Sequence, residues 1–164
     1  MIRQCVASDR EEIFSIINEA AQAYRDVIPP DRWHEPYMTR DDLDGEISDG
    51  VVFYGWAEEQ LLCVMGVQDR GDVALIRHAY VRPAVQRCGI GSAVLSRLEG
   101  LTEKKLLVGT WRDALWAIRF YEKNGYRLVS DRVKNQYLAT YWNIPARQIE
   151  TSVVLEKERR TGCR

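Results

Sequence analysis

Three strand-like runs in close succession constrain the fold of this chain more than any other feature of its sequence. They cover residues 51–57, 61–68 and 73–82, and links of only three and four residues separate them (58–60 and 69–72). Links this short leave no room for a crossover helix, so neighbouring runs must pair antiparallel. The sequence therefore predicts a sheet built around three consecutive hairpin-linked strands.

A helix and another strand follow these runs and make the predicted sheet mixed. Apolar residues at helical spacing predict a helix over 89–101, and residues 105–111 have the pattern of a strand. The strands on either side of that helix can lie parallel. The other expected elements are strands at 2–6, 126–129 and 149–157, helices near 8–24, 39–50 and 114–124, an irregular segment at 26–38 and a loop rich in tyrosine and tryptophan at 130–148. The predicted fold class is α/β of the α+β type, with a mixed, mostly antiparallel twisted sheet of about seven strands flanked by about four helices.

Size and charge narrow the classes of protein that this chain can be. A chain of 164 residues can bury a sizeable core, and we expect a single domain over 1–157 followed by a polar tail at 158–164. Its 23 lysines and arginines nearly balance 24 aspartates and glutamates without any long basic run, so nucleic acid is not an expected partner. No apolar run is long enough to span a bilayer, and the N-terminus lacks the pattern of a secretory signal. We expect a cytoplasmic protein without a membrane partner.

Cysteine and histidine use predicts no metal site. The four cysteines form no C-x-x-C pair, and the only histidines are His34 and His78. Neither spacing is that of a structural zinc site, and free thiols suit a reducing compartment.

The most informative stretch for chemistry joins the third strand to the helix that follows it. Residues 86–92 read Gln-Arg-Cys-Gly-Ile-Gly-Ser, so that two glycines end a loop and begin a helix. The first amide groups of a helix lack internal partners and lie at the positive end of its dipole, which favours an anionic phosphate there. Arg87 could add a charge-assisted contact and Ser92 a hydrogen bond. Glycines here also suit close helix packing alone, and the residues by themselves leave both interpretations open.

Two other nucleotide-binding patterns compete for the same glycines. A dinucleotide fingerprint needs a third glycine where Val94 stands and an alternating order of strands and helices, although Asp113 lies at a suitable distance for a ribose-binding acid. A P-loop needs a lysine before the serine, where Gly91 precedes Ser92. A nicotinamide oxidoreductase is therefore a weaker hypothesis, and phosphoryl transfer is not expected.

Two segments match, in order, the two signatures of one family. Residues 86–91 (Gln-Arg-Cys-Gly-Ile-Gly) have the form Q/R-x-x-G-x-G/A, and residues 117–126 form a helical segment that ends in Phe-Tyr-Glu-Lys-Asn-Gly-Tyr. In both respects the chain resembles the GNAT superfamily, the acyl-CoA-dependent N-acetyltransferases, and the order of elements agrees with that family from Ile2 to Lys157. The resemblance implies a GNAT-like sheet in which the strands at 73–82 and 105–111 form a splayed parallel pair.

The resemblance also implies acetyl-CoA as the acetyl donor. The family's pantetheine arm lies between the splayed strands and satisfies their unpaired backbone groups like an added strand. An exposed N–H near Tyr80 or Val81 would polarise the acetyl carbonyl. The chain departs from the family pattern at Cys88, where relatives often carry a basic residue, and at Ala114, where asparagine is common. The residues whose backbone amides match those that cradle the pyrophosphate are Gln86, Arg87, Cys88, Gly89, Ile90, Gly91 and Ser92.

Tyr121 and His78 are the candidate catalytic residues. By resemblance, the Tyr121 hydroxyl protonates the departing thiolate, although a tyrosine on the apolar face that includes Ala117 also suits a core position. His78 is a candidate base for the incoming ammonium because histidine titrates near neutral pH, and a carboxylate acting through water is an equal candidate. Strand alternation predicts that Arg77 and His78 face opposite sides, so that only one of them can face the cleft.

Aromatic residues are expected to border the acceptor. The family architecture places the segment between the first two helices and the loop before the last strand at the open end of the wedge. Here these segments contain Trp33, His34, Tyr37 and the stretch 137–142, and we take Trp33, Tyr37 and Tyr141 as the substrate pocket. Surface or subunit-contact roles explain such aromatic residues equally well, and homodimers are common in the family.

The expected function is transfer of an acetyl group from acetyl-CoA to a primary amine of a small molecule or peptide, by direct attack in a ternary complex. The main alternative is a CoA-binding regulatory or interaction module without turnover, in which Tyr121 serves packing alone. Release of thiol from acetyl-CoA in the presence of amines separates the two hypotheses.

Overall fold

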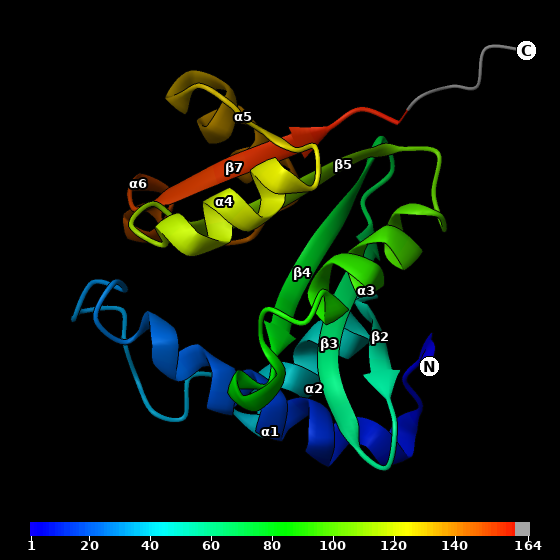
Figure 1. The fold of residues 1–164 in the computed structure, drawn as a ribbon. Helices are drawn as coiled ribbons and strands as arrows, with labels where there is room; N and C mark the ends of the chain where they lie inside the picture. Colours follow the sequence, from blue (N-terminus) through cyan, green and yellow to red (C-terminus); the bar gives the residue numbers. More distant parts are fainter. Residues whose placement is uncertain (160–164) are drawn as a thin grey trace, which may run out of the picture.

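The computed structural model describes residues 1–159. The fold consists of one seven-stranded sheet with helices on both faces (Figure 1). Its strands are β1 (Ile2–Gln4), β2 (Val52–Ala57), β3 (Leu61–Asp69), β4 (Val73–Val81), β5 (Lys105–Trp111), β6 (Arg127–Leu128) and β7 (Ser152–Lys157). Across the sheet their order is β1-β2-β3-β4-β5-β7-β6. All neighbouring pairs are antiparallel except β4 and β5, which run parallel. The expected mixed, mostly antiparallel sheet is confirmed.

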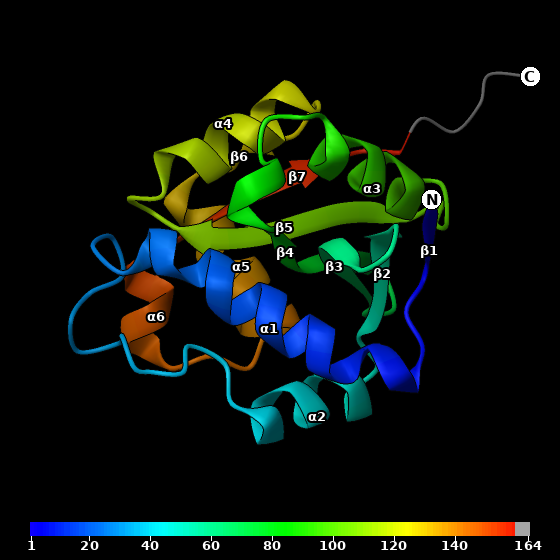
Figure 2. The same cartoon turned by 60° about the horizontal axis from the view of Figure 1, so that its bottom comes forward.

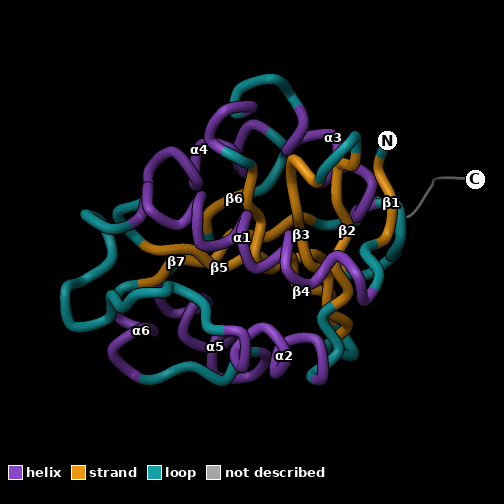
Figure 3. The backbone as a smooth tube through the Cα atoms, turned by 90° about the horizontal axis from the view of Figure 1, so that it is seen from below, coloured by secondary structure: helices purple, strands orange, loops and turns teal. Residues whose placement is uncertain are grey.

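Six helices form two layers on the sheet. They are α1 (Arg10–Ala21), α2 (Arg40–Ser48), α3 (Ile90–Glu99), α4 (Leu115–Lys123), α5 (Asp131–Tyr141) and α6 (Ala146–Glu150). In Figures 2 and 3, α3 and α4 cover one face, and α1, α2, α5 and α6 cover the other. The apolar core is divided in the same way: Val94 and Leu98 of α3 pack on one side of the sheet, and Ile16 of α1 and Leu43 of α2 pack on the other. None of the described helices is long and apolar enough to cross a membrane.

The two parallel strands stay together over a short distance only. Their pairing extends from Val73 opposite Lys105 to Ile76 opposite Val108. Beyond this point β4 continues alongside β3, and β5 continues alongside β7 as far as Trp111. The two strands consequently diverge, as Figure 1 shows, and the facing edges of their last residues lack a neighbouring strand.

A β-bulge interrupts β4 where the strands diverge. Val64 of β3 lies opposite Tyr80 and Gly66 lies opposite Arg77, so two residues of β4 occupy the place of one. The first of them, His78, adopts a left-handed backbone conformation with φ of 52°. The bulge reverses the alternation of β4 side chains, so the expectation that Arg77 and His78 face opposite sides is wrong. Both side chains contact Glu46 of α2, whereas Ala79 packs against the core on the face that α3 and α4 cover.

The segment expected to be an aromatic loop contains two helices instead, which raises the helix number above the expected four. The side chain of Ser130 accepts the N–H of Val133 and thereby caps the start of α5. On this helix Tyr137, Leu138 and Tyr141 pack against the sheet, and Tyr141 follows the other two by four and three residues on the same face. The segment therefore contributes a wall to the cleft described below.

Candidate active site

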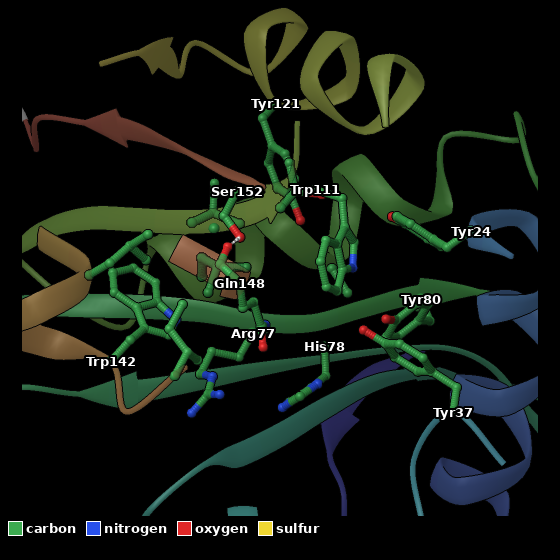
Figure 4. A pocket seen from close by; sticks show the side chains of 17 residues that line it. Tyr24, Tyr37, Arg77, His78, Tyr80, Trp111, Tyr121, Trp142, Gln148 and Ser152 are labelled. Atoms are coloured by element: carbon green, nitrogen blue, oxygen red, sulfur yellow. Dashed lines mark hydrogen bonds between the residues drawn. The ribbon is translucent and has the colours of Figure 1, made fainter. Parts of the chain in front are cut away.

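A cavity of about 140 Å³ occupies the gap between the diverging ends of β4 and β5. Figure 4 shows that its lining comes from distant parts of the chain: Tyr24 and Tyr37 from the first third, β4 and β5 from the sheet, and Trp142 and Gln148 from the segment around α6. Ser152 at the start of β7 donates a 2.6 Å hydrogen bond to the Gln148 carbonyl and fixes that segment against the sheet. The gap is thus a lined site between the two strands that the family resemblance implied to be splayed.

The loop that follows β4 presents unpartnered backbone amides at the end of this gap. In residues 1–159, none of the N–H groups from Arg87 to Ser92 donates a hydrogen bond to a protein acceptor. Gly89 precedes α3 with φ of 79°, and no side chain caps the helix. Arg87 is also left-handed, with φ of 65°. Successive amides at a helix start, next to left-handed residues, form a concave donor site suited to an anion.

The two glycines of the motif, Gly89 and Gly91, are required for different structural reasons. A Cβ on Gly89 would meet no atom within 4 Å, so its positive φ alone requires glycine and its surface stays open to a ligand. A Cβ on Gly91 would lie 3.3 Å from Val81 Cγ2 and 3.4 Å from Phe120 Cε2. Gly91 therefore permits close packing of α3, and the packing interpretation that the sequence left open applies to this glycine.

The other residues predicted to bind the cofactor lie around the same loop. Gln86, Arg87 and Cys88 are exposed, and the Gln86 side chain donates to the carbonyl of Val81 at 3.2 Å. Ile90 packs against the core under α3. The Ser92 hydroxyl accepts a 3.2 Å hydrogen bond from Asn124, which ends α4 and also donates to Phe120. Asn124 thus ties the end of α4, part of the second motif, to the first turn of α3, a connection that the sequence analysis did not identify.

Tyr80 and Tyr121 reach the cavity from opposite sides of the gap. Tyr80 follows the bulge on β4, and its ring centroid lies 6.1 Å from that of Tyr24 and 6.5 Å from that of Tyr37. Tyr121 projects down from α4 toward β5 (Figure 4) and is 6% exposed. Burial raises the pKa of both hydroxyls well above the ordinary value for tyrosine, and that of Tyr24 to about 12. These hydroxyls are therefore protonated at neutral pH, as an ordinary tyrosine also is.

The bulge places His78 and Arg77 together on the wall of the cavity. Figure 4 shows both side chains projecting from β4 in the same direction. The Nε2 atom of His78 lies 3.0 Å from Glu46 Oε2, and the same oxygen lies 2.9 Å from Arg77 Nη1. Burial acts to raise the pKa of Glu46, but the hydrogen bond to His78 and the charges of His78 and Arg77 outweigh it and hold that pKa below its usual range. Glu46 is therefore a carboxylate that orients two side chains of the site.

Of the three residues predicted to form the substrate pocket, only one lines the cavity directly. Tyr37 lines the cavity, and Trp33 stacks on Tyr37 with ring centroids 5.7 Å apart. Tyr141 packs instead beside Tyr137 on the sheet face of α5. Trp142, at the end of the same predicted stretch, lines the cavity and covers Gly109 of β5, where an added Cβ would lie 3.6 Å from the indole ring. No three His, Cys, Asp or Glu side chains of residues 1–159 group as metal ligands.

Comparisons with known proteins agree with this architecture. Residues 48–128, just under half of the chain, match the model of the acetyltransferase (GNAT) domain. No curated protein shows a significant sequence match to the chain. Among solved structures, the PaiA N-acetyltransferase of Thermoplasma acidophilum in complex with coenzyme A superposes with a TM-score of 0.72 at 18% identity, covering 96% of this chain and 98% of that one.

Two further structures extend the range of similar acetyltransferases. The ribosomal-protein-S18-alanine N-acetyltransferase of Escherichia coli has a TM-score of 0.67 at 15% identity and covers 99% of this chain and 96% of its own. An aminoglycoside 6'-N-acetyltransferase complexed with coenzyme A has a TM-score of 0.66 at 12% identity, covering 100% of this chain and 99% of that one. At such identities the likeness concerns the fold. Residues 48–128 thus match the acetyltransferase (GNAT) domain in sequence, and the described chain has the fold of these solved acetyltransferases.

Proposed function

We propose that the chain transfers an acetyl group from acetyl-CoA to a primary amine by direct attack in a ternary complex. One observation carries the proposal: buried Tyr121 lines the gap between β4 and β5, and the loop that directly follows β4 carries a row of free backbone amides. A phosphate-bearing donor with a thioester at the end of an amide-containing arm suits this combination of groups.

The described residues suit such a donor in two respects. The amides from Arg87 to Ser92 offer an anion-binding site for a pyrophosphate, and the open space over Gly89 lets it approach the backbone. The edge of β4 after Ile76 has no strand beside it on the β5 side, so its backbone groups are available to an amide-bearing arm. An N–H near Tyr80 or Val81 would lie at the acetyl carbonyl and stabilise negative charge on its oxygen.

Tyr121 supplies the proton that transfer requires. Acetyl-CoA, when bound, presents an acetyl thioester; transfer forms a carbon–nitrogen bond, breaks the carbon–sulfur bond and leaves a thiolate that must be protonated. Tyr121 is buried in the gap, and its hydroxyl is protonated at neutral pH because its pKa, raised further by burial, lies well above 7. Its place in the lining of the gap supports the role of proton donor to sulfur.

His78 removes the proton from the attacking amine in this proposal. In the neutral form of His78, Nε2–H donates to the Glu46 carboxylate and Nδ1 has a free lone pair that can take the proton. Glu46 fixes the tautomer and the ring orientation, whereas His78 receives the proton. Tyr37, with Trp33 stacked behind it, and Trp142 border the space for the acceptor.

The direct test combines a binding measurement with a turnover measurement. Calorimetric titration with coenzyme A should give binding, and a thiol-trapping reagent should detect coenzyme A released from acetyl-CoA when a panel of primary amines is supplied. Tight binding of coenzyme A without release for any amine would favour a regulatory binding module. Binding of NAD that competes with coenzyme A would instead favour a nicotinamide enzyme.

A further inference from the structure

The charges that line the cavity are unusual for a site that accepts an amine. Among the described residues, its lining contains no aspartate and no glutamate, and its only ionisable cationic side chains are Arg77 and His78. The other lining side chains are uncharged: aromatic and aliphatic ones such as Tyr37, Trp142 and Ile144, and the polar side chains of Thr110, Gln148 and Ser152. An acceptor with several ammonium groups would find no counter-charge here, and it would meet the guanidinium of Arg77.

Arg77 has hydrogen-bonding capacity that the protein leaves unused. Its Nη1 atom lies 2.9 Å from Glu46 Oε2 and donates to Gln68 Oε1 at 3.1 Å. Its Nε and Nη2 atoms have no acceptor among residues 1–159, and neither of them is sealed from solvent. The side chain is 17% exposed and lines the cavity. A guanidinium with one edge held by the protein and donors remaining is preorganised for a second anion.

Glu46, the carboxylate paired with Arg77, does not remove the preference of the cavity for an anionic group. Glu46 lies outside the lining and is occupied by both His78 and Arg77 through one oxygen. Of this ion pair, only the cationic partner Arg77 is among the residues that line the cavity. An anionic group on the acceptor is attracted to its guanidinium.

We propose that the acceptor is an α-amino acid with an apolar or aromatic side chain, whose carboxylate is bound by Arg77 and whose side chain packs between the aromatic walls of the cavity. The inference rests on the proposed acetyl transfer and names the substrate class for the same site. It distinguishes this chain from enzymes whose acceptors are polycations, because the described lining offers those acceptors no carboxylate.

The test compares acceptors that differ only in the carboxylate. Phenylalanine and phenethylamine form one pair and tryptophan and tryptamine another, and spermidine serves as a polycation. For each pair, kcat/KM for the amino acid is divided by kcat/KM for the amine that lacks the carboxylate. This ratio for the wild type is then divided by the same ratio for Arg77→Gln, so that the intrinsic reactivity of each amine cancels. A charge-assisted contact predicts that this quotient is about 10 to 100.

Two variants control for structural effects of the substitution. Arg70→Gln removes a guanidinium that lies 2.8 Å from Asp49 in a nearby polar group but does not line the cavity, so it should leave the preference unchanged. Glu46→Gln combined with Arg77→Gln removes both charges of the pair, and this double variant should show the same loss of preference as Arg77→Gln. A quotient near one, or faster turnover of spermidine than of phenylalanine, overturns the inference.

A binding measurement separates failure of this inference from failure of the proposed function. N-acetylphenylalanine should bind to the protein saturated with coenzyme A more tightly than the uncharged N-phenethylacetamide, and Arg77→Gln should abolish the difference. If no amine is acetylated but this difference is seen, the transfer proposal fails and the carboxylate site stands. If amines are acetylated and the two compounds bind equally, the transfer proposal stands and the carboxylate site is refuted.

Discussion

The two sides of the cleft are built from different parts of the polypeptide. On the proposed donor side, the groups facing the ligand are main-chain amides between Arg87 and Ser92, and only their conformation depends on the residue type. On the proposed acceptor side, the walls are side chains such as Arg77, Tyr37 and Trp142, which come from segments far apart in the sequence. A main-chain site tolerates changes of side chain and keeps one ligand, whereas a side-chain site can change its ligand with few substitutions.

Replacement of Tyr121 by phenylalanine should have the largest effect and tests the boundary between the two sides. Loss of a general acid predicts a fall in kcat of about 10²- to 10⁴-fold. Affinity for coenzyme A, measured by calorimetry, should stay near the wild-type value, since the amides are unchanged. An equal loss of coenzyme A binding and turnover would show that the donor side depends on the Tyr121 side chain. The donor side would then not be a purely main-chain site.

Substitution of His78 should produce a loss that depends on pH. His78→Asn is the suitable variant because asparagine tolerates the left-handed conformation at the bulge, where φ is 52°. We expect kcat/KM to fall by roughly 10²-fold at neutral pH. The loss should shrink at alkaline pH, where the amine is already neutral. A loss that is constant with pH would assign a purely structural role to His78.

Glu46→Gln should destabilise the acceptor side by about 1–3 kcal/mol at neutral pH, since it weakens contacts to both His78 and Arg77. The folded-state pKa of Glu46 lies below its ordinary value of 4.5. Its contribution to stability is therefore present above pH 4.5 and is lost as the pH falls through the lowered pKa. Urea unfolding at a series of pH values should show the difference between wild type and variant shrinking below that point; a difference that persists at low pH contradicts this assignment.

Gly89→Ala should weaken coenzyme A binding by roughly tenfold, because a left-handed alanine costs about 1–2 kcal/mol and the loop will shift to relieve it. Gly91→Ala acts differently, since its Cβ meets Val81 and Phe120, and it should lower stability before it lowers affinity. Calorimetry and urea unfolding on both variants distinguish the two effects. An equal loss of coenzyme A affinity in both variants would show that the two glycines have the same role.

Cys88→Ser should have the smallest effect of all. The thiol is exposed and donates a weak hydrogen bond to the Gln86 carbonyl at 3.7 Å. Turnover and coenzyme A affinity should match the wild type within about twofold, as expected for an exposed side chain. Abolished turnover would instead indicate an acyl-enzyme route through this sulfur.

The sequence predicted the strand and helix of the proposed donor side well because their signals are local. Residues 105–111 were expected as a strand and form one, and the two glycines mark the start of α3 within one residue. Hairpin links of a few residues were enough to predict the antiparallel half of the sheet. These features depend on neighbours in the chain, where periodicity and turn residues carry the information.

The acceptor side was less predictable because its geometry depends on distant contacts. Nothing in residues 73–82 marks His78 as the site of a bulge, and strict alternation therefore separated it from Arg77. Position along a segment also did not decide between Tyr141, which packs on the sheet, and Trp142, which reaches the cavity. The helix α5 could have been predicted, since Ser130 and the apolar spacing of residues 133, 137, 138 and 141 are helical signals.

Only four rungs of backbone pairing, Val73 to Ile76 against Lys105 to Val108, hold the strands β1 to β4 to the strands β5 to β7 within the sheet. A donor lying in the gap would complete that seam, and by mass action it would add about 2.7 kcal/mol to the folded state at a concentration one hundred times its Kd. Resistance of this protein to heat and to cellular proteases would then rise and fall with the supply of its own cosubstrate, so that metabolic state would regulate how much enzyme survives as well as how fast it works.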